Sequence, residues 1–287
     1  MKEGVAPTPA YWYYGLILIS LILIIMSLAY KRDWRLLILY FNIIAAIYPF
    51  EITVLILFHG YCYLPGIVDD PKLDNYLGSY VSNSLIVPAS AMAINAFSLY
   101  WKYSMAIAAL FTGIDWYFAK LGIYRHFWWK SIYTGIGLSI LYLISKWFWR
   151  HLQSKRPTLL FRLLAIYATY APIHNLIVFI LNQGGRLFRF QVNWFADPEK
   201  SHQIFSFLHL LVTSIVITLC IGLRIQFRYR LLGIMALPLM NWLFEQCHIF
   251  SFSIPDFTAL HYSLISILAV AIVIFLFKLA RLDYLFP

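Results

Sequence analysis

Four ionisable side chains fall inside long apolar stretches of the sequence, where charged groups are unexpected. They are Glu51, Asp115, His174 and Glu245. Placing such a group in hydrocarbon costs about 3 kcal/mol on insertion scales, so each one requires a partner or a water-filled cavity. Carboxylates and imidazoles at similar depth can hold a proton, a cation or a metal ion. The sequence therefore predicts a polar chamber within the protein.

Two of these groups also have simpler explanations. His174 and Asn175 follow Pro172, whose missing N–H frees a carbonyl one turn earlier and lets the helix bend toward a cavity. A private hydrogen bond between helices is the alternative for His174. For Glu245 the alternative is a carboxylate near a helix end whose side chain reaches interfacial water. The predicted ligand-binding set still contains all of these residues, with Asn175 beside His174.

A metal site and a familiar catalytic motif both lack support in the sequence. Glu245 and His248 share one helix face, and His202 and His209 lie seven residues apart on another. One such pair without its partner motifs does not define a metal centre. We therefore expect no metal and no cofactor, with His209 and His248 as the candidate ligands should a metal bind. No zincin, nucleophile-elbow, phosphate-loop or dinucleotide motif is present, so no catalytic residue is assigned.

An aromatic run with basic neighbours offers a second kind of contact. Arg125 and Lys130 flank Phe127-Trp128-Trp129. Tryptophans at a helix end are typical of the membrane interface. The alternative is a clamp in which Arg125 and Lys130 bind an anionic group such as a lipid headgroup.

The elements that carry these residues must be membrane helices. Of the 287 residues 62% are hydrophobic and 12% are charged, about half the charged fraction of roughly 25% that soluble proteins carry. Near-continuous apolar runs favour helices over barrel strands. Runs of about 20 residues cross a bilayer, and nine occur, with the two longest connections, 59–83 and 183–203, expected along the membrane surface. The expected spans are 11–30, 36–58, 84–101, 103–121, 128–149, 159–182, 204–223, 230–247 and 259–280.

The distribution of Lys and Arg predicts the orientation of these spans. Most of the 22 basic residues fall on the side that holds the loops after spans one, three, five and seven and the C-terminus. Cytoplasmic loops carry such an excess, which places the N-terminus outside and the C-terminus inside. The four buried ionisable groups then lie toward the outer side. A basic inner rim facing anionic lipid explains the net charge of +10 without a nucleic-acid partner.

The sequence also matches itself at an offset of 126 to 127 residues. The segment 35–40 returns at 162–167 as Arg-Leu-Leu followed by Tyr, and Asp70-Pro71 returns as Asp197-Pro198. The segments 101–103 and 115–118 return at 227–229 and 241–244. Such a period predicts a duplicated unit. We expect an anchor helix in residues 1–34, one four-helix repeat in 35–156 and a second in 157–287.

The expected fold is therefore all-α, with one plus two times four transmembrane helices. An even number of spans preserves orientation, so the repeats should be parallel. The acids are not duplicated: Glu51 aligns with Val178, and Asp115 with Asn241. Each repeat would then contribute different chemistry to a site between them.

Four short motifs are distinctive within roughly residues 30–150: Arg32-Asp33-Trp34-Arg35, Gly113-Ile114-Asp115-Trp116, Lys120-Leu121-Gly122 and Trp128-Trp129-x-Ser131. In these motifs the segment resembles an uncharacterised family of small multi-pass membrane proteins from spore-forming Gram-positive bacteria. Here Asp115 stands where the family has Glu, and residues 124–127 replace a His-Asn-Gly segment. The resemblance implies a bacterial cytoplasmic membrane, or a spore membrane derived from it, and implies no chemistry.

Three functions follow as hypotheses. The first is a carrier, receptor or accessory protein that binds a small molecule, ion or lipid headgroup in an outward-facing polar site between the repeats. The second is an intramembrane enzyme that pairs Asp115 or Glu51 with His174 as acid and base on a lipid-like substrate. The third is a structural subunit of a membrane complex, with another membrane protein as its partner.

Overall fold

The computed structural model describes residues 9–154, 157–185, 187–223, 225–282 and 286, most of which are helical. Of the basic residues that predict the orientation, Lys2, Lys155, Arg156, Arg186 and Arg224 lie outside this part. The chain forms two compact units, Met1–Gln153 and Ser154–Pro287. The first predicted span therefore packs with the four that follow it, as part of unit 1.

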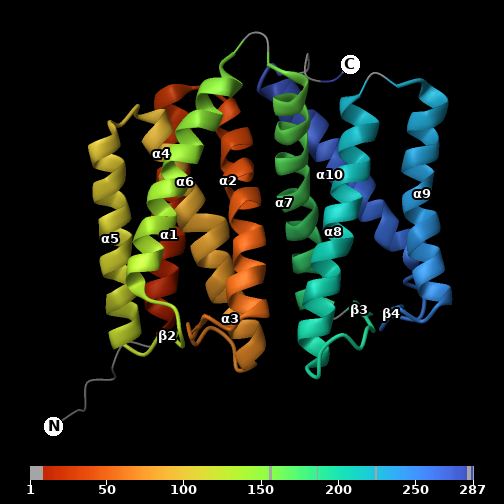
Figure 1. The fold of residues 1–287 in the computed structure, drawn as a ribbon, viewed down its shortest axis with the longest axis horizontal. Helices are drawn as coiled ribbons and strands as arrows, with labels where there is room; N and C mark the ends of the chain where they lie inside the picture. The colour runs from red at the N-terminus through yellow and green to blue at the C-terminus, as the bar shows by residue number, and fades with distance from the viewer. Residues whose placement is uncertain (1–8, 155–156, 186, 224, 283–285, 287) are drawn as a thin grey trace. The chain divides into compact units, whose positions relative to one another are not determined.

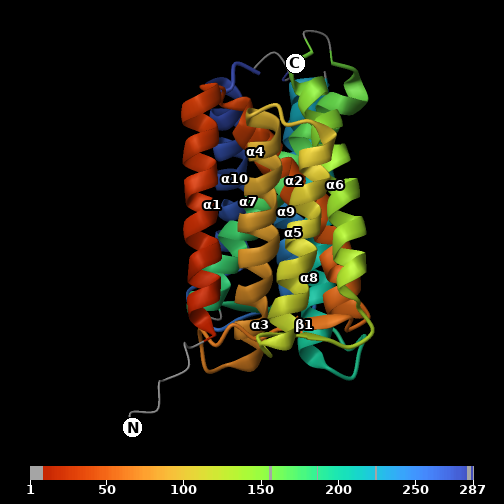
Figure 2. The same ribbon diagram turned by 90° about the vertical axis from the view of Figure 1, so that its left-hand side faces the viewer.

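Unit 1 is a helical bundle closed at one end by a short strand pair (Figure 1). Figure 2 shows its long helices along a common direction, with β1 and α3 at one end. Strands β1 and β2 are antiparallel, and Tyr63 lies opposite Tyr124. In chain order the elements are α1 (Ala10–Lys31), α2 (Arg35–Glu51), η1 (Ile52–Leu57), β1 (Tyr61–Tyr63), α3 (Pro71–Tyr80), η2 (Val81–Ile86), α4 (Val87–Ala96), α5 (Trp101–Lys120), β2 (Tyr124–His126) and α6 (Ser131–Leu152).

Two of these elements, η1 and η2, are π-helical turns. Before η1, Pro49 lies inside α2 and supplies no N–H to the helix. The Phe58 N–H donates to the Thr53 carbonyl at 3.0 Å, five residues back. Segment η2 continues α3 into α4 in the same wide geometry. Such turns are rare and are frequent at functional sites.

Unit 2 has a related order of elements. Its strands are antiparallel, with Phe190 opposite Phe250. Asp197 caps α8 by accepting from the Glu199 N–H, as Asp70 caps α3 by accepting from the Lys72 and Leu73 N–H groups. The elements are α7 (Leu159–Gly185), β3 (Phe188–Phe190), α8 (Pro198–Gly222), α9 (Phe227–Gln246), β4 (Phe250–Phe252) and α10 (Ala259–Leu279).

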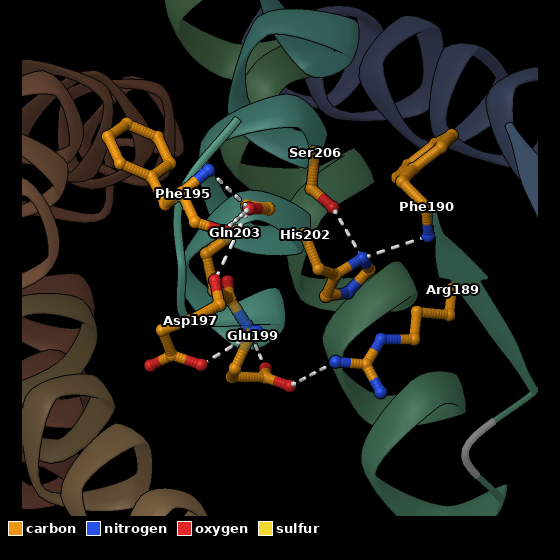
Figure 3. A network of polar contacts seen from close by, with 9 residues as sticks. Arg189, Phe190, Phe195, Asp197, Glu199, His202, Gln203 and Ser206 are labelled. Carbon is orange, nitrogen blue, oxygen red and sulfur yellow. Dashed lines mark hydrogen bonds and ion pairs between the residues drawn. The ribbon is translucent and has the colours of Figure 1, made fainter. Parts of the chain in front are cut away.

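A polar network fastens β3 to the first turns of α8 (Figure 3). The Phe190 N–H donates to Nδ1 of His202 at 3.0 Å. Glu199 forms an ion pair with Arg189 at 3.7 Å and accepts a hydrogen bond from Gln203 at 3.1 Å. His202, which the sequence placed on one face with His209, therefore has a structural role at this strand.

In the described part of the chain six helices are long and apolar enough to cross a membrane: Ala10–Lys31, Arg35–Leu57, Pro71–Ala96, Leu159–Asn182, Pro198–Gly222 and Ala259–Leu279. Large apolar side chains such as Leu18, Ile25 and Ile267 remain more than half exposed on them, as expected for surfaces that contact lipid. The protein is therefore an integral membrane protein. The third of these helices begins at Pro71, thirteen residues before the expected span, because Asp70 and Pro71 start a helix there.

Candidate functional site

A cavity of about 350 Å³ opens within unit 1. Its walls come from α1, α2, η2, the start of α4, α5, α6 and the two strands of this unit. Most of the lining is apolar or aromatic, and two carboxylates, Glu51 and Asp115, are part of it. The sequence placed a site between the repeats, whereas this cavity is lined by unit 1 alone.

Glu51 is the last residue of α2, where the chain passes into η1. Its side chain is buried and accepts two hydrogen bonds of 2.6 Å, one from the Tyr61 hydroxyl and one from the Ser79 hydroxyl. Both donors are neutral groups. The position of Glu51 beside a π-turn and a strand explains how a carboxylate is tolerated at this depth.

Asp115 lies on α5 and is anchored from α6. Its Oδ2 accepts from the Thr134 hydroxyl at 2.9 Å, and Thr134 in turn accepts from the indole N–H of Trp129 at 2.9 Å. Nε2 of His126 lies 3.0 Å from Oδ1, close enough for an ion pair, but neither atom has a hydrogen-bond partner among the described residues. The Asp115 side chain is only 8% exposed, and its Oδ1 has no hydrogen-bond donor among the described residues.

An aromatic wall joins the two carboxylates. The ring of Tyr61 lies 5.6 Å from Tyr63, 5.3 Å from Tyr124 and 5.6 Å from Trp129. Burial, together with the nearby Glu51 carboxylate, raises the pKa of the Tyr61 phenol well above its ordinary value. Tyr61 therefore stays a hydrogen-bond donor at neutral pH, and the wall stays uncharged.

The cavity opens on the α2 and α6 side of unit 1. Among its lining residues, Phe50, Tyr133, Ile140 and Ile144 are exposed. Lining residues that are also exposed mark the mouth. The mouth is apolar, and the polar groups lie deeper, toward the strand pair.

Three other predicted site residues, His174, Asn175 and Glu245, lie in unit 2. His174 and Glu245 have partners within that unit. His174 is buried on α7, and its Nε2 lies 3.2 Å from the Ser266 hydroxyl of α10. Its neighbour Asn175 is partly buried. Glu245, at the end of α9, accepts from the Ala259 N–H at 3.2 Å, so it satisfies a backbone donor at the start of α10.

The two candidate metal ligands lie in different surroundings. Nε2 of His209 lies 2.7 Å from the Asn241 side-chain oxygen. His248 is exposed and has a φ of 56°, in the left-handed region just after α9. Among the described residues no three His, Cys, Asp or Glu side chains come close enough together to hold a metal ion.

The predicted anion contacts lie outside the cavity. Arg125 is exposed on β2 opposite Cys62, and Lys130 is exposed immediately before α6. Trp129, expected at the interface, is instead buried and lines the cavity. Arg125 and Lys130 are therefore rim residues with respect to this site.

Sequence reasoning missed most of the residues that hold the two carboxylates. Ser79, Tyr61 and Thr134 are ordinary polar residues in the sequence, and nothing in their spacing marks them. His126 was missed as well, because the three-residue strand that carries it has no periodicity to mark it in the sequence. The structure places that imidazole beside Asp115.

Comparisons with known proteins give no matching family model, no matching curated protein and no matching solved structure. The function is therefore argued from the chemistry of the site itself.

Proposed function

We propose that this integral membrane protein binds a small molecule in the cavity of unit 1, as a carrier or receptor. The observation that carries the proposal is the pair of buried carboxylates, Glu51 and Asp115, in the lining of one cavity. A carboxylate at this depth is costly and is usually functional. A cavity of about 350 Å³ lies within the range of ligand sites, roughly 300 to 1,000 Å³.

The proposal includes nine transmembrane spans, with the N-terminus outside and the C-terminus inside. Helices α5, α6 and α9 occupy the remaining expected spans and have 20, 22 and 20 residues. At 1.5 Å per residue these lengths reach about 30 Å, the thickness of the hydrocarbon core. The cavity, near the strand pair of unit 1, would then face the outer side of a bacterial membrane.

The proposal also includes a duplicated unit. After α1, the two units have the same order of elements: helix, strand, helix, helix, strand, helix. In unit 1, α2 with η1 counts as one helical run, and so does α3 with η2 and α4. Each pair of equivalent strands is offset by 126 or 127 residues and has the same register.

Equivalent hydrogen bonds support the same duplication. The Tyr63 N–H donates to the Asn75 side chain at 2.8 Å, as the Phe190 N–H donates to His202. The Leu64 N–H donates to the Ile123 carbonyl, as the Gln191 N–H donates to the Ile249 carbonyl. Side chains as different as Asn and His keep one bond in place, which favours common descent over chance.

The two units differ where the carboxylates lie. In unit 2 the positions of Glu51 and Tyr61 are taken by Val178 and Phe188, and the position of Asp115 by Asn241. An acid and its hydroxyl donor have thus been exchanged together for two apolar residues. The scaffold does not require either group, which supports a role for them in binding.

An acid–base enzyme is the second candidate function. The contact between Asp115 and His126 at 3.0 Å favours it, since a carboxylate can orient an imidazole for proton transfer. His126 does not line the cavity, so binding is the better supported function. Loss of turnover in His126→Gln with unchanged binding would favour the enzyme.

Thiol labelling tests whether the cavity admits small molecules. The cysteines Cys62, Cys220 and Cys247 are free and are first replaced by Ser. A cysteine is then placed at Ser82, which lines the cavity, and as a matched control at Ser90, which is buried against Tyr142 outside it. We expect neutral methyl methanethiosulfonate to label Ser82→Cys at least about tenfold faster than Ser90→Cys, because only the first thiol meets the cavity.

A second pair of variants tests whether labelling passes through the cavity. A Cβ at Gly137, which lines the cavity, or at Gly113, which does not, meets nothing within 4 Å. We expect Gly137→Phe to slow labelling of Ser82→Cys at least about tenfold, and Gly113→Phe to leave it unchanged. Equal labelling at Ser82→Cys and Ser90→Cys, or no effect of Gly137→Phe, would refute the proposed site.

A further inference from the structure

The charges that face the cavity in unit 1 are of one sign. Glu51 and Asp115 line it, and none of its described lining residues is Lys, Arg or His. The basic residues at the strand end, Arg125 and Lys130, are exposed outside it. An anionic ligand would therefore meet like charge without a basic partner, at a cost in free energy.

Among the described residues neither carboxylate has a Lys or Arg side chain within ion-pair distance. Both oxygens of Glu51 accept from the neutral hydroxyls of Tyr61 and Ser79. Asp115 has the His126 imidazole beside one oxygen, and that oxygen has no hydrogen-bond donor among the described residues. Buried acceptors of this kind need a donor, and a cationic donor satisfies both charge and hydrogen bonding.

The walls favour an organic cation over a metal ion. Tyr61, Tyr63, Tyr124 and Trp129 form a continuous aromatic wall. Aromatic faces attract ammonium groups through the ring quadrupole, and cages of such rings bind quaternary ammonium ligands. Hard metal ions instead require about six oxygen ligands, and most of this lining is apolar or aromatic.

The rest of the cavity fits the apolar part of such a ligand. At the mouth, Ile140 and Ile144 line it, so a ligand would place its charge near the carboxylates and its hydrocarbon near the opening. A cavity of about 350 Å³ is at the small end of ligand sites. We propose that unit 1 binds an ammonium ion carried on a small apolar body, between Glu51, Asp115 and the aromatic wall. This inference rests on the binding function proposed above.

Charged thiol reagents of similar size provide the test. In the full-length Ser82→Cys protein, labelling by trimethylammonioethyl methanethiosulfonate is compared with labelling by its sulfonatoethyl counterpart. The matched control is a variant that keeps only native Cys247, which is exposed. We expect the cation-to-anion rate ratio at Ser82→Cys to exceed that at Cys247 at least about tenfold, because fields in a low-dielectric cavity concentrate counter-ions.

Neutralising variants locate the source of that preference. We expect Asp115→Asn and, independently, Glu51→Gln to lower the ratio at least about threefold while labelling by the neutral reagent persists. Two variants are used because one of them can fail to fold. Lys130→Gln, outside the cavity, should change the ratio by less than about twofold.

Competition by an isosteric set completes the experiment. Benzyltrimethylammonium should protect Ser82→Cys from the neutral reagent, whereas neutral neopentylbenzene and anionic phenylmethanesulfonate should protect at least about tenfold less well. Neutral labelling without a cation preference and without selective protection overturns the cation inference and leaves the binding cavity standing. Failure of the neutral reagent to label Ser82→Cys faster than Ser90→Cys overturns both.

Discussion

The hydrogen bond between Glu51 and Tyr61 provides a quantitative test of the site. Tyr61→Phe removes one donor to a buried carboxylate and should lower the free energy of unfolding by about 1.5 to 3 kcal/mol. Glu51→Val leaves two buried hydroxyls, those of Tyr61 and Ser79, without their acceptor, at about 1 to 3 kcal/mol for each. The double variant gives unit 1 the apolar pair that unit 2 has at the equivalent positions, Val178 and Phe188.

The double variant should therefore be more stable than the sum of the single effects predicts. We expect a coupling energy of about 1 to 3 kcal/mol, because no phenol remains to lose its acceptor. The assay is reversible unfolding in mixed micelles, titrated with dodecyl sulfate and followed by tryptophan fluorescence. The residual destabilisation should come from the Ser79 hydroxyl.

A control cycle guards against general effects of the substitutions. Ser90 bonds Tyr142 and does not line the cavity, so Tyr61→Phe and Ser90→Ala should add within about 0.5 kcal/mol. Additive effects of Glu51→Val and Tyr61→Phe would refute the geometry described here. Full ammonium selectivity in that double variant would show that Glu51 is dispensable for binding.

Three further predictions concern stability. Burial raises the pKa of Tyr124 well above its ordinary value, so this phenol stays neutral in the folded protein while it ionises in the unfolded chain. The contribution of Tyr124 to stability should be full below about pH 10 and fall above it. Unfolding measured at pH 8 to 11 should show a less steep fall in Tyr124→Phe. His248, with a φ of 56°, occupies the position of Gly122, with a φ of 73°. His248→Gly should stabilise the fold by up to about 1 kcal/mol, and Gly122→Ala should destabilise it by about 1 kcal/mol or more. A large loss of stability in His248→Gly would contradict this reasoning. A Cβ added at Gly78 would clash with Cβ of Tyr63. Gly78→Ala should therefore destabilise the folded protein by about 1 to 3 kcal/mol and expose Tyr63 to quenchers. Wild-type stability in this variant would contradict the close packing.

Helix positions could be predicted from the sequence because bilayer thickness imposes a length on every span. Each expected span overlaps a helix in the described part of the chain, and six of these helices are long and apolar enough to cross a membrane. The limits of α3 were harder to predict, because residues 71–80 are polar enough to resemble a surface loop. Only the Asp70-Pro71 start marks this segment as a helix. The strands were not expected, since three-residue segments carry no periodicity.

The site could be predicted only in part. Glu51 and Asp115 were recognised because an acid in an apolar run is unusual in any fold, and they line one cavity. His174 and Glu245 were recognised for the same reason, yet their neighbours are a hydroxyl and a backbone N–H in unit 2. Composition signals that a polar group is buried, but it carries no information on which partner satisfies it.

By itself the sequence determined the solvent and the elements, because hydropathy acts residue by residue along one helix. It also determined which acids would have to be accommodated in lipid. Only the tertiary structure decided that Tyr61 and Ser79 bond Glu51, that His126 lies beside Asp115, and that Trp129 faces a cavity instead of the interface. The hydrogen bonds and the ion pair join residues 10 to 28 positions apart, and their geometry depends on how π-turns, strands and helices pack together.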